Sequence, residues 1–160
     1  KSVDALQRLV EGVFSALLSL HNELGFAHGD LRSDNMVLEP QAYERGVLVP
    51  LLVDFDLSVR LSSCRTDKRR ARFIRDDVLA ACDMLAEDDS DDAPSPFTCP
   101  GVDLQSIREL ADRIRMNCST ASAALDTARI WFDELRRERV SSIVSTSSSD
   151  SGSDASPCLQ

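Results

Sequence analysis

Two polar loops, separated by a predicted β-hairpin, limit what this chain can fold into more than any other feature. The first loop carries Asp30 and Asn35, and the second carries Asp54 directly after an apolar run. A hairpin between them, with strands at 36–39 and 47–53 joined by a polar turn, would bring the two loops together. These three side chains accept protons or bind hard cations. Their convergence therefore predicts one shared polar site.

Helices are predicted around this hairpin. Apolar residues at three-and-four spacing predict an amphipathic helix over 3–24, with Ser2 as its N-cap and Gly25 just past its C-terminus. Residues 57–75 lack a clear period and are expected to form loop and turns. The apolar stretch 76–86 predicts a short helix that is buried on most sides.

The C-terminal half is expected to hold two more helices between polar segments. Residues 87–97 are acidic, with Ser and Pro, and predict an exposed, mobile loop. Asp103 is a candidate N-cap for a helix that runs to about Met116, and a last helix is expected over 119–139. A Ser/Asp-rich tail over 141–160 is expected to be disordered.

The run from His28 to Asn35 (His-Gly-Asp-Leu-Arg-Ser-Asp-Asn), followed by Asp54-Phe55-Asp56, resembles the C-terminal lobe of a protein-kinase-like fold. Divergent fungal protein kinases are the most similar group. The resemblance is specific over about residues 3–56. It implies an α+β, mainly α domain over 1–140, a helical bundle with a small β-hairpin, from which the N-terminal lobe is absent.

The resemblance implies a role for each polar residue of the two loops. Asp30 would accept the proton of the substrate hydroxyl or orient that hydroxyl. Arg32 would neutralise the charge of the transferring phosphate, because a guanidinium cannot lose its proton. Asn35 and Asp54 would bind the Mg²⁺ ion that bridges the phosphates of ATP.

Four further residues would support these loops. His28 and Phe55 would pack against the two loops and form hydrogen bonds that hold them. Either Asp76 or Asp77 would accept hydrogen bonds from backbone N–H groups of the first loop, and so fix that loop to the buried helix.

The sequence departs from regulated protein kinases at two positions. Gly29 stands where those enzymes carry an Arg that binds a phosphate on the activation loop, so no such phosphorylation is expected here. Asp56 replaces the Gly of Asp-Phe-Gly, which makes a flipped inactive state less favourable. His-Gly-Asp is also frequent in aminoglycoside, choline and fructosamine phosphotransferases. No Ala-Pro-Glu motif follows.

The function that the resemblance implies is ATP- and Mg²⁺-dependent transfer of a phosphoryl group to a protein Ser/Thr hydroxyl, in a full-length parent protein. One alternative is a phosphotransferase for small-molecule hydroxyls, of the aminoglycoside or choline type. Another is a non-catalytic pseudokinase or truncated interaction module. Neither a glycine-rich loop nor a strand lysine precedes the first helix. The chain, which starts at Lys1, is therefore expected to be a fragment that alone is inactive.

Composition narrows the class of partner and compartment. A net charge of −9 disfavours nucleic acid as a binding partner. The five cysteines form no Cys-x-x-Cys pair, which predicts reduced thiols in an intracellular compartment, the cytoplasm or the nucleus. No uninterrupted apolar run of the length of a membrane span and no signal peptide are found, so no membrane association is expected.

Three other features have mainly structural interpretations. The basic run 68–75 is interpreted as a solvated loop face, with a nuclear-localisation patch or a site for an acidic substrate as alternatives. Cys82 is interpreted as a core residue. His21 is interpreted as a residue on the surface of the first helix.

Overall fold

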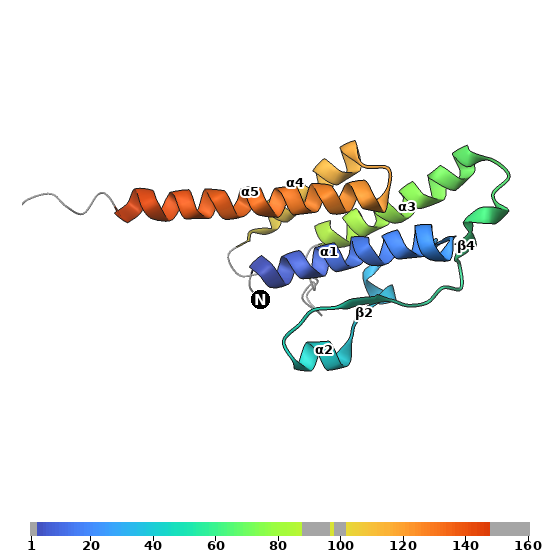
Figure 1. The fold of residues 1–160 in the computed structure, drawn as a ribbon, viewed down its shortest axis with the longest axis horizontal. Helices are drawn as coiled ribbons and strands as arrows, with labels where there is room; N and C mark the ends of the chain where they lie inside the picture. The colour runs from blue at the N-terminus through green and yellow to red at the C-terminus, as the bar shows by residue number, and fades with distance from the viewer. Residues whose placement is uncertain (1–2, 88–96, 98–101, 148–160) are drawn as a thin grey trace, which may run out of the picture.

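The computed structural model describes residues 3–87, 97 and 102–147, with the backbone alone over 140–147. Helices dominate, and two small two-stranded sheets accompany them (Figure 1). This arrangement confirms the predicted α+β, mainly α class.

The first helix follows the apolar stripe predicted for it. Helix α1 spans Val3–Ser19 and continues as a π-helical turn over Leu20–Leu24. Gly25 then adopts the left-handed conformation (φ 74°), and its N–H donates to the carbonyl of Leu20. Glycine suits this position because it has no Cβ to clash there. The predicted cap Ser2 lies outside the described residues.

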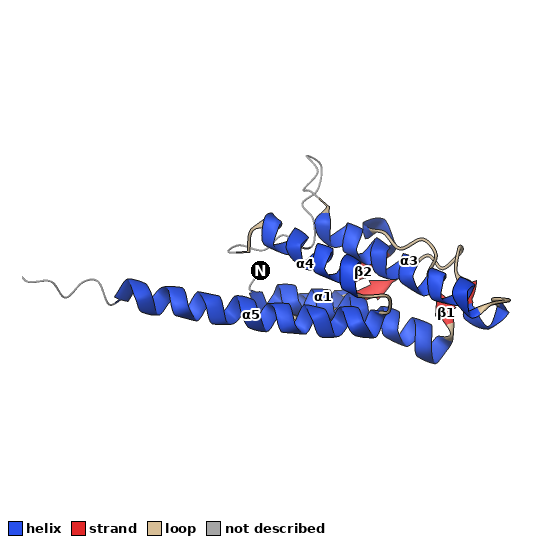
Figure 2. Cartoon of the chain, turned by 90° about the horizontal axis from the view of Figure 1, so that it is seen from above, coloured by secondary structure: helices blue, strands red, loops and turns tan. Residues whose placement is uncertain are grey.

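Four long helices form the main body of the described residues. They are α1, α3 (Asp67–Ala86), α4 (Leu104–Asn117) and α5 (Ala121–Ser147). Helix α1 packs against α5, and α3 packs against α4 (Figure 2). Their facing stripes make one apolar core, whose largest fully buried side chains include Phe14, Phe132, Met84, Leu110 and Ile114.

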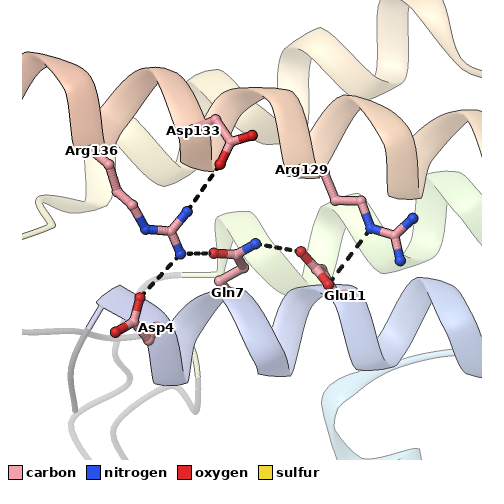
Figure 3. A network of polar contacts seen from close by, with 6 residues as sticks. All are labelled: Asp4, Gln7, Glu11, Arg129, Asp133 and Arg136. Atoms are coloured by element: carbon pink, nitrogen blue, oxygen red, sulfur yellow. Dashed lines mark hydrogen bonds and ion pairs between the residues drawn. The ribbon is translucent and has the colours of Figure 1, made fainter.

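Polar contacts join α1 to α5 along the edge of this core (Figure 3). The guanidinium of Arg136 donates to Asp4 at 3.0 Å and also to Gln7. Gln7 in turn donates to Glu11 at 2.5 Å, and Glu11 pairs with Arg129 at 3.7 Å. These contacts fix the register of the two helices, although each exposed pair adds little stability.

The predicted hairpin is present, with shorter strands and a different connection. Strands β2 (Met36–Leu38) and β3 (Pro50–Leu52) pair antiparallel. The connection contains a helix, α2 (Pro40–Glu44), so the predicted simple turn is wrong. The side chain of Glu39 caps α2 by accepting the N–H groups of Gln41 and Ala42, and proline at the first helical position favours this start.

The segment predicted as loop over 57–75 contains regular structure. Strand β4 (Val59–Arg60) pairs antiparallel with β1 (Phe26–Ala27), and a 3₁₀ turn over Leu61–Ser63 follows. Helix α3 begins at Asp67, so the prediction of loop is wrong from there on. The side chain of Thr66 caps α3 by accepting the N–H of Arg69 at 3.2 Å.

The last two helices are close to their predictions. Asp103 caps α4 by accepting the N–H of Ser106 at 2.9 Å. Helix α5 continues through Ser147, past the predicted start of the tail at 141. Of the predicted acidic loop, residues 88–96 lie outside the described residues, and Phe97 is buried rather than exposed. Residues 148–160 also lie outside the described residues.

Candidate functional site

The first loop is held to helix α3 by a single buried carboxylate, that of Asp77. Its Oδ2 accepts the backbone N–H of His28 at 2.7 Å, and its Oδ1 accepts the N–H of Gly29 at 2.9 Å. Of the two candidates, Asp77 therefore occupies the anchoring position. Asp76 is exposed and pairs with Arg72 at 3.6 Å. Hydrogen bonds to an ionised acceptor are the stronger kind, so α3 fixes the start of the loop.

His21 belongs to the same buried cluster, and its interpretation as a surface residue is wrong. The side chain is 2 % exposed, and its Nε2 donates to Asp77 Oδ2 at 2.8 Å. A signal for this burial was present, because Phe14, Leu17 and His21 follow three-and-four spacing on one face of the helix. The ring joins the end of the first helix to the anchor of the loop.

His28 links the first loop to the second. The residue is fully buried, and its Nε2 donates to the carbonyl of Val53 at 3.0 Å. Its ring also lies 4.9 Å, centroid to centroid, from the ring of Phe55. His28, two positions before Asp30, thereby contacts the backbone of Val53 and the side chain of Phe55, on either side of Asp54.

Gly29 is needed for a close approach between the two loops. It has a positive φ of 81°, and a Cβ built on it would lie 2.4 Å from the carbonyl oxygen of Leu57. A larger residue would have to displace backbone, so no side chain fits at this position without moving the second loop. Glycine is thus required here by packing.

The structure brings Asp30 and Asn35 together. The amide Nδ2 of Asn35 donates to the carbonyl of Asp30 at 2.8 Å and to its Oδ2 at 3.2 Å. A 3₁₀ turn over Ser33–Asn35 holds the amide in place. Asn35 is buried and Asp30 is half-buried. Within the described part of the chain, no donor reaches the Oδ1 atom of Asn35.

Asp54 directly follows Val53, the residue that pairs with Asn35 through the backbone of the hairpin. The N–H of Val53 donates to the carbonyl of Asn35 at 2.9 Å, which continues the pairing of β2 with β3 by one step. Asp54 follows directly, in the left-handed conformation with φ 62°. This conformation costs a residue with a Cβ about 1–2 kcal/mol and is found preferentially at functional sites. Its carboxylate is exposed, without a hydrogen bond or ion pair among the described residues.

Arg32 and Ser33 form contacts with residues outside the candidate site. The guanidinium of Arg32 pairs with Asp34 at 2.5 Å, and both side chains are more than half exposed. The hydroxyl of Ser33 donates to Glu87 at 2.5 Å, which ties the loop to the end of α3. Arg32 is thus beside the candidate site but is engaged in a surface ion pair.

The contacts above leave Oδ1 of Asn35 and the carboxylate of Asp54 without a hydrogen-bond partner among the described residues. Within the part of the chain that the structure describes, no three His, Cys, Asp or Glu side chains lie close enough to hold a metal alone. Mg²⁺ is commonly bound by one or two protein oxygens together with phosphates and water. Asn35 Oδ1 and the carboxylate of Asp54 are donors of that kind.

Comparison with known proteins adds no family to this geometry. Against models of protein families and against curated protein sequences, the chain finds no match. In the described ranges, no helix combines the length and apolar character that crossing a membrane requires.

Proposed function

We propose that this chain is the substrate- and metal-binding part of a kinase-like phosphotransferase, in which Mg²⁺-ATP donates a phosphoryl group to a protein Ser/Thr hydroxyl. The remaining nucleotide contacts would come from a segment outside this chain. One observation carries the proposal, namely that Asn35 connects Asp30 and Asp54. The side-chain amide of Asn35 donates to the carboxylate of Asp30, and the carbonyl of Asn35 accepts the N–H of Val53. Asp54, in the left-handed conformation, follows Val53 directly.

Asp30 is the proposed group that receives the acceptor hydroxyl. Its Oδ2 is bonded to the amide of Asn35, which leaves Oδ1 to accept the hydrogen bond of a substrate hydroxyl. A positioned carboxylate orients the attacking oxygen and takes its proton as the bond to phosphorus forms. The amide of Asn35 keeps the carboxylate in one rotamer.

Asn35 and Asp54 are the proposed ligands of the metal. The bound ion would neutralise charge on the transferring phosphoryl group. Asn35 offers Oδ1 because its Nδ2 is committed to Asp30, and Asp54 offers an exposed carboxylate. Arg32 would add a positive charge after leaving Asp34, and an exposed pair of this kind holds it by only about 0–1 kcal/mol.

The test uses the complete gene product with radiolabelled ATP, Mg²⁺ and a mixture of protein acceptors. Asp30→Asn should leave the thermal shift caused by Mg²⁺-ATP intact and lower phosphoryl transfer at least about a hundredfold. Asp54→Asn should remove both the shift and the transfer. Asp56→Asn is the matched control, because it removes the same charge from an exposed residue two positions away, and it should preserve both.

Either of two outcomes would contradict the proposal and indicate a different function. Transfer to small-molecule alcohols with none to protein would indicate a small-molecule phosphotransferase. The absence of both a thermal shift and a product from the wild-type protein would indicate a non-catalytic module.

A further inference from the structure

The first half of helix α3 concentrates the positive charge of the molecule. Residues 60–75 contain seven Lys or Arg and one acidic residue, Asp67, which gives a net charge of +6. Since the whole chain carries −9, all other residues together carry −15. Most of these basic residues follow one another on the helix: Lys68, Arg69, Arg70, Arg72 and Arg75.

Part of this basic stretch, together with Asp76, lines a groove. The groove has a volume of about 960 Å³ and runs along the first half of α3 to Ser119, in the turn between α4 and α5. Phe73 lines it, and the guanidinium of Arg69 lies 5.7 Å from the centroid of that ring. Arg72 is paired with Asp76, but at 3.6 Å and with 81 % of its side chain exposed. The charges are therefore almost wholly available to a partner.

We propose that this groove docks an acidic segment of the protein substrate, so that the enzyme selects hydroxyls flanked by aspartate or glutamate. The inference rests on the proposed function and names its substrate class. Arginine side chains bind carboxylates with two hydrogen bonds, and Phe73 gives the groove an apolar contact for the peptide backbone.

The groove and the candidate site are linked through one rigid element, helix α3. Arg75 lies two residues before Asp77, whose carboxylate holds the N–H groups of His28 and Gly29. From Lys68 to Asp77 the helix rises about 14 Å, a span that about four extended residues cover. A peptide with its hydroxyl near Asp30 could thus place neighbouring acidic residues along this helix.

The acidic tail of the same molecule is not a suitable occupant. Helix α5, which begins near Ser119, has 27 residues and so ends about 40 Å away. Figure 1 shows its end opposite to the first half of α3. Asp150 and Asp154 follow Ser147 by at most seven residues, which span about 25 Å when fully extended. The occupant is therefore not this tail.

A short acidic peptide also fits better than a nucleic acid or an anionic membrane. Both of those present negative charge over distances well beyond the screening length of about 8–10 Å. They would meet the rest of the molecule, which carries −15. A short peptide can contact the basic groove alone.

The test is peptide binding without ATP, measured by fluorescence polarisation on the full chain. The probe is a labelled nonapeptide with one serine between four aspartates on each side, and its counterpart has asparagine at those eight positions. The variant R69Q/R72Q/R75Q removes three charges from the groove. The matched control R45Q/R113Q/R129Q removes three exposed arginines elsewhere, so both variants have the same net charge.

The aspartate peptide should bind at least about tenfold more tightly than the asparagine peptide. The groove variant should weaken that binding about tenfold and the control variant less than about twofold, since a few partly screened charges contribute on this scale. Equal losses in both variants, equal binding of both peptides, or displacement of the peptide by single-stranded RNA or phosphatidylserine vesicles at lower concentration would each overturn the inference.

Failure of this inference is distinguishable from failure of the proposed function. A complete gene product that phosphorylates the two peptides at equal rates would overturn acidic docking and support phosphoryl transfer. Selective binding of the aspartate peptide with no transfer to it would support the groove and count against the enzyme.

Discussion

The two halves of helix α3 share one backbone and differ in almost everything else. From Asp67 to Arg75 the side chains are mostly exposed and basic, whereas from Asp77 to Ala86 they are mostly buried and apolar. The buried half packs against α1 and α4 and carries the carboxylate that anchors the first loop. The exposed half borders the basic groove.

Different forces make the two halves of α3 helical. Burial of an apolar face stabilises the second half. The first half has no such face, and depends on the Thr66 cap and on continuation from the buried half. Asp77 joins the buried half to the candidate site.

Replacing Asp77 by Ala should have the largest effect. The N–H groups of His28 and Gly29 and the Nε2–H of His21 would lose their common acceptor. A buried donor without a partner costs about 1–3 kcal/mol, so the free energy of unfolding should fall by about 5 kcal/mol in urea titrations. Asp76→Ala, on the adjacent exposed residue, should change it by less than about 0.5 kcal/mol.

That prediction remains testable if Asp77→Ala does not fold. Asp77→Asn keeps one oxygen acceptor, so it should fold and lose about 2 kcal/mol. Equal, small losses for the variants at positions 76 and 77 would show that the anchor contributes nothing to the loop.

The reactivity of the Cys82 thiol is a measure of how deeply the second half of α3 is buried. Desolvation raises the pKa of the Cys82 thiol to about 12, although Arg115 opposes the shift. Because the thiolate is the reactive form, alkylation at pH 8 should be about a thousandfold slower in the native chain than in urea. Cys64, a half-buried residue just before the exposed half, should show a much smaller ratio.

The raised pKa of Cys82 also predicts how the free energy of unfolding depends on pH. The folded chain keeps the Cys82 proton more tightly than the unfolded chain, whose thiol titrates near 9. The contribution of this group is complete below that pH and is lost as the pH rises toward 12. Cys82→Ala should flatten that part of the curve. An unchanged slope would contradict the burial of the thiol.

Core truncation should distinguish the halves directly. Met84 is 1 % exposed, and Met84→Ala should cost about 3 kcal/mol because it leaves a cavity. Arg72→Ala, on the exposed half, should change the free energy of unfolding by less than about 0.5 kcal/mol, since only a long surface ion pair is lost. Denaturant titration of both variants measures the difference. Similar costs would mean that the first half also packs against the core.

The contrast explains which elements were predictable from the sequence. Helices α1 and α4 were predicted because an apolar stripe and, in α4, the Asp103 cap mark them. The first half of α3 was missed because its exposed side chains leave no hydrophobic period. Helix α2 was missed because it is short and its start depends on a local cap by Glu39.

The candidate site was predictable in outline but not in detail. The order of motifs located Asp30, Asn35 and Asp54 on two loops around a hairpin. Asp76 and Asp77 are adjacent polar residues about 100° apart on a helix, so only the rotation of α3 within the bundle decides which is buried. The burial of His21 does not follow from the pattern alone, because a polar residue on an apolar stripe is buried only where it has a partner, and that partner, Asp77, is distant in sequence.

Removing the cap of α3 should have the smallest effect, and it tests the exposed half most selectively. Thr66→Ala deletes the oxygen that accepts the N–H of Arg69, and should cost about 1 kcal/mol. Because the two halves depend on different contacts, hydrogen exchange should accelerate for amides 68–72 while amides 78–85 keep their protection relative to global unfolding. Thr66→Ser, which keeps the acceptor, should restore the slow exchange. Equal acceleration along the whole helix would mean that α3 opens as a single unit, and that its exposed half draws its stability from the core after all.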